Sequence, residues 1–268
     1  MKRMNSDFST NTLSFNFSQC QAKLALKFLR QTFSKIPRAM FDSRGDKCFC
    51  AQCFTDKERV FTRGKPPKKY CLPIGWTRFG LATNAGFLEM NNVWGAWHVS
   101  YHGTSAQNMV LIFKAGKRLL KAGDVALGGK EIGVVKGHIK GCFTRVNKFT
   151  GTREKFNPNQ IFTSPSPKYA SHPAYSKVQR FPHPDKKGRE IEAQFMFQVR
   201  QRPGSYAIGQ ETVGASAQNI VLDPEFNPNE LEWYTRENVG IVIHGLLVRV
   251  REVETPDERR SRERREVA

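Results

Sequence analysis

The chain has 268 residues, 39% of them hydrophobic and 20 of them Phe, which is enough for one sizeable domain with its own core. Its 43 Lys and Arg residues outweigh 24 Asp and Glu residues, giving a formal net charge of +19. This surplus is spread along the sequence and suits nucleic acid, anionic lipid or a phosphorylated ligand, or else serves solubility alone. No apolar run approaches the roughly 20 residues that cross a bilayer, which excludes a helical membrane span.

Residues 1–40 are predicted to form a disordered polar start followed by an amphipathic helix. The start lacks the apolar core of a secretory signal, so we expect a cytoplasmic protein, with a nuclear or mitochondrial location left open. A transit peptide is the alternative, and Asp7 argues against it. The helix is expected within 19–35 because its apolar residues fall on one side, Leu24, Ala25, Phe28 and Leu29. This helix either packs on the domain or lies on an anionic surface.

Residues 41–80 form a cysteine-rich segment. Cys48, Cys50 and Cys53 are closely spaced, and Cys71 follows after 17 further residues. Four thiolates are the number that a tetrahedral structural zinc requires, so the segment predicts a zinc site made of these four cysteines. The spacing differs from standard zinc-finger spacings, and the alternative is that the cysteines are small buried residues.

The stretch from Trp97 to Leu120 predicts a strand, a sharp turn and a helix. Apolar and polar residues alternate up to Tyr101-His102, and Gly103 then allows the backbone to approach a ligand closely. Thr104 or Ser105 can cap the following helix, whose apolar face is Met109, Ile112 and Phe113, with Gly116 at its C-terminal end. Taken alone, an imidazole in such a turn is more often structural than functional.

This pattern resembles the opening motif of the diphtheria-toxin-type ADP-ribosyltransferases, which include the poly(ADP-ribose) polymerases. The residues that carry the resemblance are His102-Gly103-Thr104 followed by Ile112, Gly116 and Leu119. The resemblance implies that His102 bonds the adenosine ribose of NAD and that the Gly103 backbone holds the carboxamide, with Thr104 beside them.

A second motif of the same family is matched in part by residues 160–175. The family has a strand tyrosine where this chain has Phe162, whose ring can stack on a nicotinamide but offers no hydroxyl. Ser164 follows in a Ser/Pro turn, and either Tyr169 or Tyr175 corresponds to the family's helix tyrosine. A proline-rich surface turn with core aromatics is the alternative interpretation. The long Gly- and Lys-rich segment before it, 123–159, is expected to frame the cofactor cleft.

The third motif places a catalytic glutamate at the start of a short strand, with a buried strand bearing a Leu-Leu pair downstream. Glu232, followed by Trp233-Tyr234 and by Leu246-Leu247, fits this spacing. The nearby competitors are Glu225, Glu230 and Glu237. A glutamate beside aromatic residues is ordinarily a surface or ion-pair residue.

About three quarters of the chain also resembles the C-terminal region of the neuralized-like protein 4 family. The shared segments include the cysteine triplet, Gly75-Trp76, Tyr101-His102-Gly103-Thr104, the 161–166 segment and Glu232-Trp233-Tyr234-Thr235. The resemblances imply an α+β fold, an ADP-ribosyltransferase-like arrangement of two small, roughly perpendicular sheets with flanking helices. The cysteine-rich segment precedes this domain, which is expected over 81–252, and a charged disordered tail over 253–268 follows it.

The function that this reading predicts is NAD-dependent mono-ADP-ribosylation of a protein or nucleic-acid acceptor, with NAD as substrate and a structural zinc. A long strand over Glu190 to Arg200 completes the expected domain, because apolar and polar residues alternate along it. Two other functions stay open. One is a catalytically inactive, zinc-stabilised interaction module with a transferase-like fold, and the other is a nucleic-acid-binding domain that uses the positive charge.

Overall fold

The computed structural model describes residues 20–55, 58–125, 129, 131–132, 144–146, 153–155, 159–255, 257, 258, 260 and 264. The described helices are α1 (Gln21–Thr32), α2 (Ala85–Met90), α3 (Val93–Ala96), α4 (Ala106–Lys114) and α5 (Pro167–Ala170), with short 3-10 turns at Arg38–Met40, Ser43–Gly45, Ser216–Gln218 and Pro228–Glu230. The disorder expected before residue 20, most of the 123–159 segment and much of the 253–268 tail lie outside the described residues.

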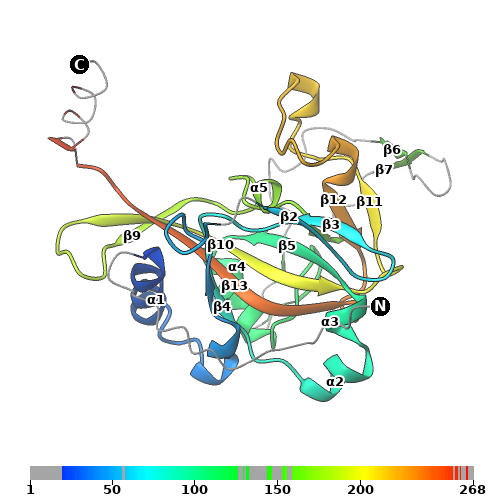
Figure 1. The fold of residues 1–268 in the computed structure, drawn as a ribbon, viewed down its shortest axis with the longest axis horizontal. Helices are drawn as coiled ribbons and strands as arrows, with labels where there is room; N and C mark the ends of the chain where they lie inside the picture. Colours follow the sequence, from blue (N-terminus) through cyan, green and yellow to red (C-terminus); the bar gives the residue numbers. More distant parts are fainter. Residues whose placement is uncertain are drawn as a thin grey trace.

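The strands form one large antiparallel sheet and three smaller ones (Figure 1). The large sheet has the order β1-β4-β13-β10-β5, with β9 pairing with β10; its strands are β1 (Lys47–Cys48), β4 (Thr77–Gly80), β5 (His98–Thr104), β9 (Gln179–Pro182), β10 (Glu190–Gln201) and β13 (Ile241–Glu252). A second sheet has the order β11-β12-β8, from β8 (Ile161–Thr163), β11 (Ala207–Gly209) and β12 (Glu232–Thr235). Two hairpins pair β2 (Val60–Arg63) with β3 (Lys68–Cys71) and β6 (Thr144–Val146) with β7 (Arg153–Lys155).

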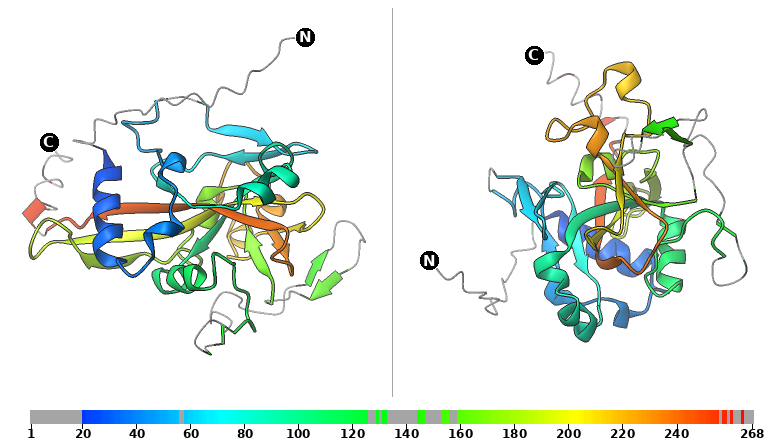
Figure 2. Two further views of the ribbon diagram at one scale, coloured as in Figure 1. Left: turned by 90° about the horizontal axis from the view of Figure 1, so that it is seen from below. Right: turned by 90° about the vertical axis from the view of Figure 1, so that its right-hand side faces the viewer.

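The large sheet buries both of its faces. One face packs against α1 and α4 in a core that includes Phe28, Met109, Phe195, Phe197 and Leu246. The other face packs against the β2–β3 hairpin and α5, through Tyr70, Trp76, Tyr101, Met196 and Leu247. The views in Figure 2 place α4 and the hairpin on opposite sides of this sheet. Alternate residues of β10 therefore enter different cores, as the period of a strand requires.

The two sheets meet at the edge strand β5. Tyr101 of β5 and Ser164, which follows β8, exchange two backbone hydrogen bonds, at 2.7 and 2.9 Å. Residue Phe162 of β8 in turn pairs with Tyr234 of β12. The strands that carry the three predicted motifs, β5, β8 and β12, are therefore neighbours in space although they span more than a hundred residues of sequence.

Several local predictions are confirmed. Ser105 is the N-cap of α4, accepting a bond from Asn108 N at 3.2 Å, and Gly116 follows its end with φ +68°. The fold is α+β with several antiparallel sheets and few helices, as expected. None of the helices in the described part of the chain is long and apolar enough to cross a membrane.

Candidate active site and thiol cluster

The candidate active site begins at the outer edge of β5. Tyr101 points its backbone N–H and C=O toward Ser164, and these groups alternate in direction along a strand. The backbone groups of Gly103, two residues on, therefore point outward at the same edge, beyond the end of the pairing with Ser164. Position 103 also requires a residue without a side chain, because a Cβ there would collide with the Ala170 carbonyl oxygen and lie 2.9 Å from Tyr175 Cβ.

The tautomer of His102 is fixed by a hydrogen bond from its ring to a backbone carbonyl group. Its Nδ1 lies 2.8 Å from the carbonyl oxygen of Phe162, and because a carbonyl only accepts, Nδ1 carries the proton. Burial lowers the pKa of this imidazole below its ordinary value, so the ring is neutral at pH 7. In the neutral tautomer Nε2 is an acceptor, which suits a hydroxyl donor.

The two tyrosines of the second motif, Tyr169 and Tyr175, differ in how deeply they are buried. Tyr169, on α5, is 2% exposed, and its hydroxyl donates to Glu232 Oε2 at 2.8 Å. Tyr175 is half-buried beside Gly103, and its hydroxyl lies 2.6 Å from that of Tyr169. Burial raises the pKa of both hydroxyls, which therefore stay protonated. Of the two rings, Tyr175 is the one that a ligand at the Gly103 edge can reach.

Glu232 is the first residue of β12, as predicted, and it is 1% exposed. Its Oε2 accepts from Tyr169, from Thr212 Oγ1 at 2.7 Å and from Tyr175 at 3.4 Å. Phe162 lies opposite Tyr234, two residues from Glu232, so Phe162 and Glu232 lie on one face of the small sheet. The competing residues Glu225, Glu230 and Glu237 are exposed.

Two further predicted cofactor contacts have structural partners. Thr104 is 3% exposed and its Oγ1 lies 3.4 Å from the Ser105 carbonyl oxygen. Ser164 is 1% exposed, and its Oγ accepts from Ser166 N at 3.1 Å. Ser164 thus shapes the turn that leads into α5. Sequence reasoning missed Thr212, which lies in a loop with no periodic pattern.

Four thiols gather in a second site, at the N-terminus of α1. The sulfur atoms of Cys20, Cys48, Cys50 and Cys53 all lie within 4.8 Å of one another. Cys20 Sγ is 3.2 Å from Cys48 Sγ, 3.7 Å from Cys50 Sγ and 3.2 Å from Cys53 Sγ. A tetrahedral ion with metal–sulfur bonds of about 2.3 Å would hold its sulfurs about 3.8 Å apart. The four side chains can therefore hold one metal ion after small adjustments.

The thiol pKa values differ within this cluster. Burial raises the pKa of Cys20 and Cys53 to about 11 and of Cys48 to about 12. Burial also acts to raise that of Cys50, but hydrogen bonds from the Cys48 side chain and neighbouring backbone outweigh it and lower the pKa to about 7. Cys50 is thus the thiol that deprotonates most readily, and a bound cation would favour the thiolate form of all four.

The prediction that Cys71 is the fourth ligand is wrong. Cys71 lies at the end of β3 and packs with Tyr169, Phe226 and Leu231, apart from the cluster. Burial raises its pKa to about 12, so it stays a neutral thiol. The fourth thiol of the cluster is Cys20 instead. Cys20 is the N-cap of α1, and its sulfur accepts a hydrogen bond from Ala22 N at 3.4 Å. The signal in the sequence was a lone cysteine directly before an amphipathic helix.

The arrangement as a whole offers a buried carboxylate, a neutral imidazole and an outward-facing backbone edge around half-buried aromatic rings. Such groups can bond hydroxyl and amide groups of a ligand and stabilise positive charge next to a carboxylate. No family model matches the chain.

Proposed function

We propose that this protein is an NAD-dependent ADP-ribosyltransferase that transfers a single ADP-ribose unit to a protein or nucleic-acid acceptor. The observation that carries the proposal is the meeting of the three motifs: His102 bonds the Phe162 backbone, while Glu232 bonds Tyr169 and Tyr175 on the same face as Phe162. These residues come from three separate parts of the chain and resemble the family's site in order and, apart from Phe162, in type. In this proposal the two main sheets correspond to the family's two sheets.

The proposed binding mode assigns each group to a part of NAD. The Gly103 N–H and C=O at the open edge of β5 suit an amide, which is the nicotinamide carboxamide. The bare Nε2 of neutral His102 accepts from a ribose hydroxyl. The half-buried rings of Tyr175 and Phe162 stack on the nicotinamide. Tyr169 keeps the role seen in its contacts, which is to hold the carboxylate.

The chemistry follows from charge. Breaking the bond between nicotinamide and ribose builds positive charge on the ribose carbon, and a carboxylate held nearby stabilises it. Glu232 is fixed by hydroxyls from Tyr169 and Thr212 at 2.8 and 2.7 Å, so its orientation is set before the reaction begins. Nicotinamide leaves as a neutral molecule with the bonding electron pair, the acceptor nucleophile forms a new bond to the same carbon, and the proton that the nucleophile loses passes to solvent.

We further propose that the metal is zinc and that it is structural. Four sulfur donors fill a tetrahedral shell and leave no position for a substrate, as in closed structural sites. Cys20 links α1 to β1 and to the loop after it, so the ion would fasten the helix to the large sheet.

Labelling with isotopically marked NAD tests the proposal directly. Wild-type protein is incubated with the labelled cofactor beside the Glu232→Gln variant, and covalent label is measured on the protein itself and on added acceptors. The proposal requires label in the wild type that the variant loses. Absence of both labelling and saturable NAD binding in the wild type would overturn it.

A second candidate, a zinc-stabilised interaction module without catalysis, is favoured by two specific observations. Glu232 is 1% exposed, so its carboxylate must become accessible before it can meet a ribose. Phe162 also lacks the hydroxyl that the family carries at this position. Saturable NAD binding measured by calorimetry separates the two candidates, because the module has no need of the cofactor.

A further inference from the structure

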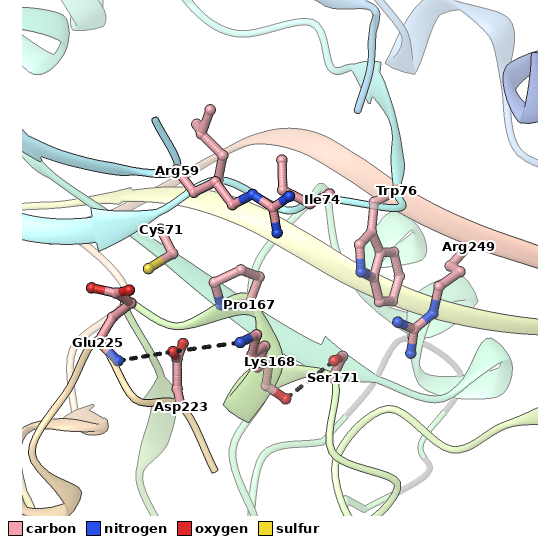
Figure 3. A pocket seen from close by; sticks show the side chains of 11 residues that line it. Arg59, Cys71, Ile74, Trp76, Pro167, Lys168, Ser171, Asp223, Glu225 and Arg249 are labelled. Atoms are coloured by element: carbon pink, nitrogen blue, oxygen red, sulfur yellow. Dashed lines mark hydrogen bonds and ion pairs between the residues drawn. The ribbon is translucent and has the colours of Figure 1, made fainter. Parts of the chain in front are cut away.

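A cavity lies beside α5, over the face of the large sheet that packs with Trp76. It has a volume of about 180 Å³. Three cationic residues reach into it from different elements: Arg59 from before β2, Lys168 from α5 and Arg249 from β13 (Figure 3). Leu72, Ile74 and Trp76 supply apolar walls. Of the three cationic residues, Arg249 is half-buried over the Trp76 ring, and a cation held away from water in this way is stabilised by a bound anion.

Arg249 places its positive charge between an aromatic ring and a neutral amide. Its guanidinium lies 4.7 Å from the centre of the Trp76 ring, and its Nη2 donates to the neutral amide oxygen of Gln194. Burial lowers its pKa below the ordinary value, because the charged form is less well solvated there. Among the described residues, no carboxylate forms an ion pair with Arg249 or with Arg59.

Two carboxylates, Asp223 and Glu225, also line the cavity, and Asp223 is paired with Lys168. Asp223 is 2% exposed; it accepts from Ser166 Oγ at 2.5 Å and from Glu225 N at 3.2 Å, and lies 3.9 Å from Lys168 Nζ. Glu225 is exposed at the mouth. Three cationic side chains therefore face two carboxylates, and because Asp223 is paired with Lys168, Arg59 and Arg249 are the cations of the cavity that have no carboxylate partner among the described residues.

We propose that this cavity binds a phosphate monoester. A guanidinium group can bond two oxygens of one phosphate group. Two guanidinium groups and an ammonium group together match the double negative charge of a phosphate monoester better than the single charge of a carboxylate ligand. The volume is below the roughly 300 Å³ at which ligand pockets for drug-sized molecules begin, so it suits a phosphoryl group and a few further atoms rather than a dinucleotide. The site is distinct from the proposed NAD site, although α5 contributes to both: Lys168 to one and Tyr169 to the other.

Titration with three phosphate compounds tests this proposal. Inorganic phosphate, O-phosphoserine and AMP are each titrated into the full chain by calorimetry, with tryptophan fluorescence as a second signal because Trp76 forms one wall. We expect binding that weakens about tenfold to a hundredfold in Arg59→Gln and Arg249→Gln. Arg38→Gln is the matched control, since Arg38 is exposed on a 3-10 turn away from the cavity.

Several outcomes decide the matter. Binding that is unchanged in Arg59→Gln would overturn the proposal. Arg59 is exposed, so this variant keeps the fold and remains informative even if Arg249→Gln is destabilised by losing its contact with Trp76. Binding that is lost in His102→Ala but kept in both arginine variants would assign the phosphate to the proposed NAD site and also overturn the proposal. Tighter binding of O-phosphoserine than of AMP would identify a phosphorylated protein side chain as the source of the bound phosphate group. Tighter binding of AMP would identify a nucleotide as its source.

Discussion

The thiol cluster and the Glu232 site both join residues that are distant in sequence, yet they differ in how far they open to solvent. Three of its four thiols, Cys20, Cys48 and Cys50, are 8%, 4% and 4% exposed, Cys53 is half-buried, and their nearest polar partners are mostly one another. The Glu232 carboxylate is equally buried, but His102, Gly103, Phe162 and Tyr175 around it are half-buried. A closed shell suits a structural ion, whereas a partly open rim over a buried charge suits a ligand.

This difference means that the two regions should fail in different ways. Damage to the cluster should release α1 and lower stability while leaving the groups around Glu232 chemically intact. Damage to the Glu232 site should alter binding or rate with little loss of metal. The predictions below use this contrast, from the largest expected effect to the smallest.

Cys20→Ser should cost the protein its metal. Structural zinc in small finger peptides contributes on the order of 10 kcal/mol, and a missing thiolate removes much of that affinity. We expect zinc content to fall from one ion per chain toward none, with a lower melting temperature. Cys71→Ser is the matched control and should keep its zinc, because Cys71 packs with Tyr169 and Phe226 instead. Elemental analysis of both variants decides between the two cysteines; zinc lost only from Cys71→Ser would refute the assignment.

Glu232→Gln should abolish transfer while leaving NAD binding and zinc content nearly unchanged. Removing one preorganised electrostatic partner of a transition state costs about a hundredfold to a thousandfold in rate, roughly 2.7–4 kcal/mol. His102→Ala should differ by weakening NAD binding as well, since its partner is present before the reaction. Calorimetry and the labelling assay are run on both variants. Wild-type labelling by Glu232→Gln would exclude this carboxylate as the catalytic group.

The sequence predicted those parts of the molecule that depend on short-range pattern. The alternation around Phe195 and Phe197 gave β10, observed as Glu190–Gln201, and Ser105 with Gly116 marked both ends of α4. Three of the four clustered thiols lie within six residues of one another and were found for that reason. A strand or a helix end is set by neighbours in the chain, so local residues are sufficient to indicate it.

What the sequence missed depends on which distant segments meet. Cys20 is 28 residues before Cys48, and only the packing of α1 against the large sheet brings the two together. Thr212 reaches Glu232 from a loop that has no pattern of its own. The choice between Tyr169 and Tyr175 also needed coordinates, because both lie on the same short segment and only their depth of burial separates them.

Gly103→Ala should damage the Glu232 site without touching the cluster. The added methyl group would collide with the Ala170 carbonyl oxygen and press on Tyr175, so strand and α5 must separate. Overpacking of this kind costs about 1–3 kcal/mol, and NAD binding should weaken by a comparable amount. Gly86→Ala is the control, because its nearest new contact, at 3.5 Å from Oδ1 of the α2 N-cap Asn84, is an ordinary one. Equal affinities for NAD in the two variants would remove Gly103 from the proposed site.

The smallest expected effect concerns the pH dependence of stability. Burial lowers the pKa of His102 in the folded state, so the unfolded chain binds the extra proton as pH falls below about 6.5, the ordinary histidine value. Stability is therefore complete above that pH and declines below it until the folded pKa is reached, by up to about 1.4 kcal/mol per pH unit for each such histidine.

His98, His172 and His244 shift in the same direction, chiefly through burial, so the wild-type decline contains several contributions. His102→Gln keeps a donor for the Phe162 carbonyl oxygen but cannot titrate. Urea unfolding of wild type and variant at a series of pH values from 7 to 5.5 should therefore show a shallower decline in the variant. Taking the difference cancels the other histidines and any loss of metal from the thiol cluster, which both proteins share. Parallel curves would mean that His102 has an ordinary pKa. The assignment of a neutral imidazole whose Nε2 accepts a hydrogen bond would then be unsupported.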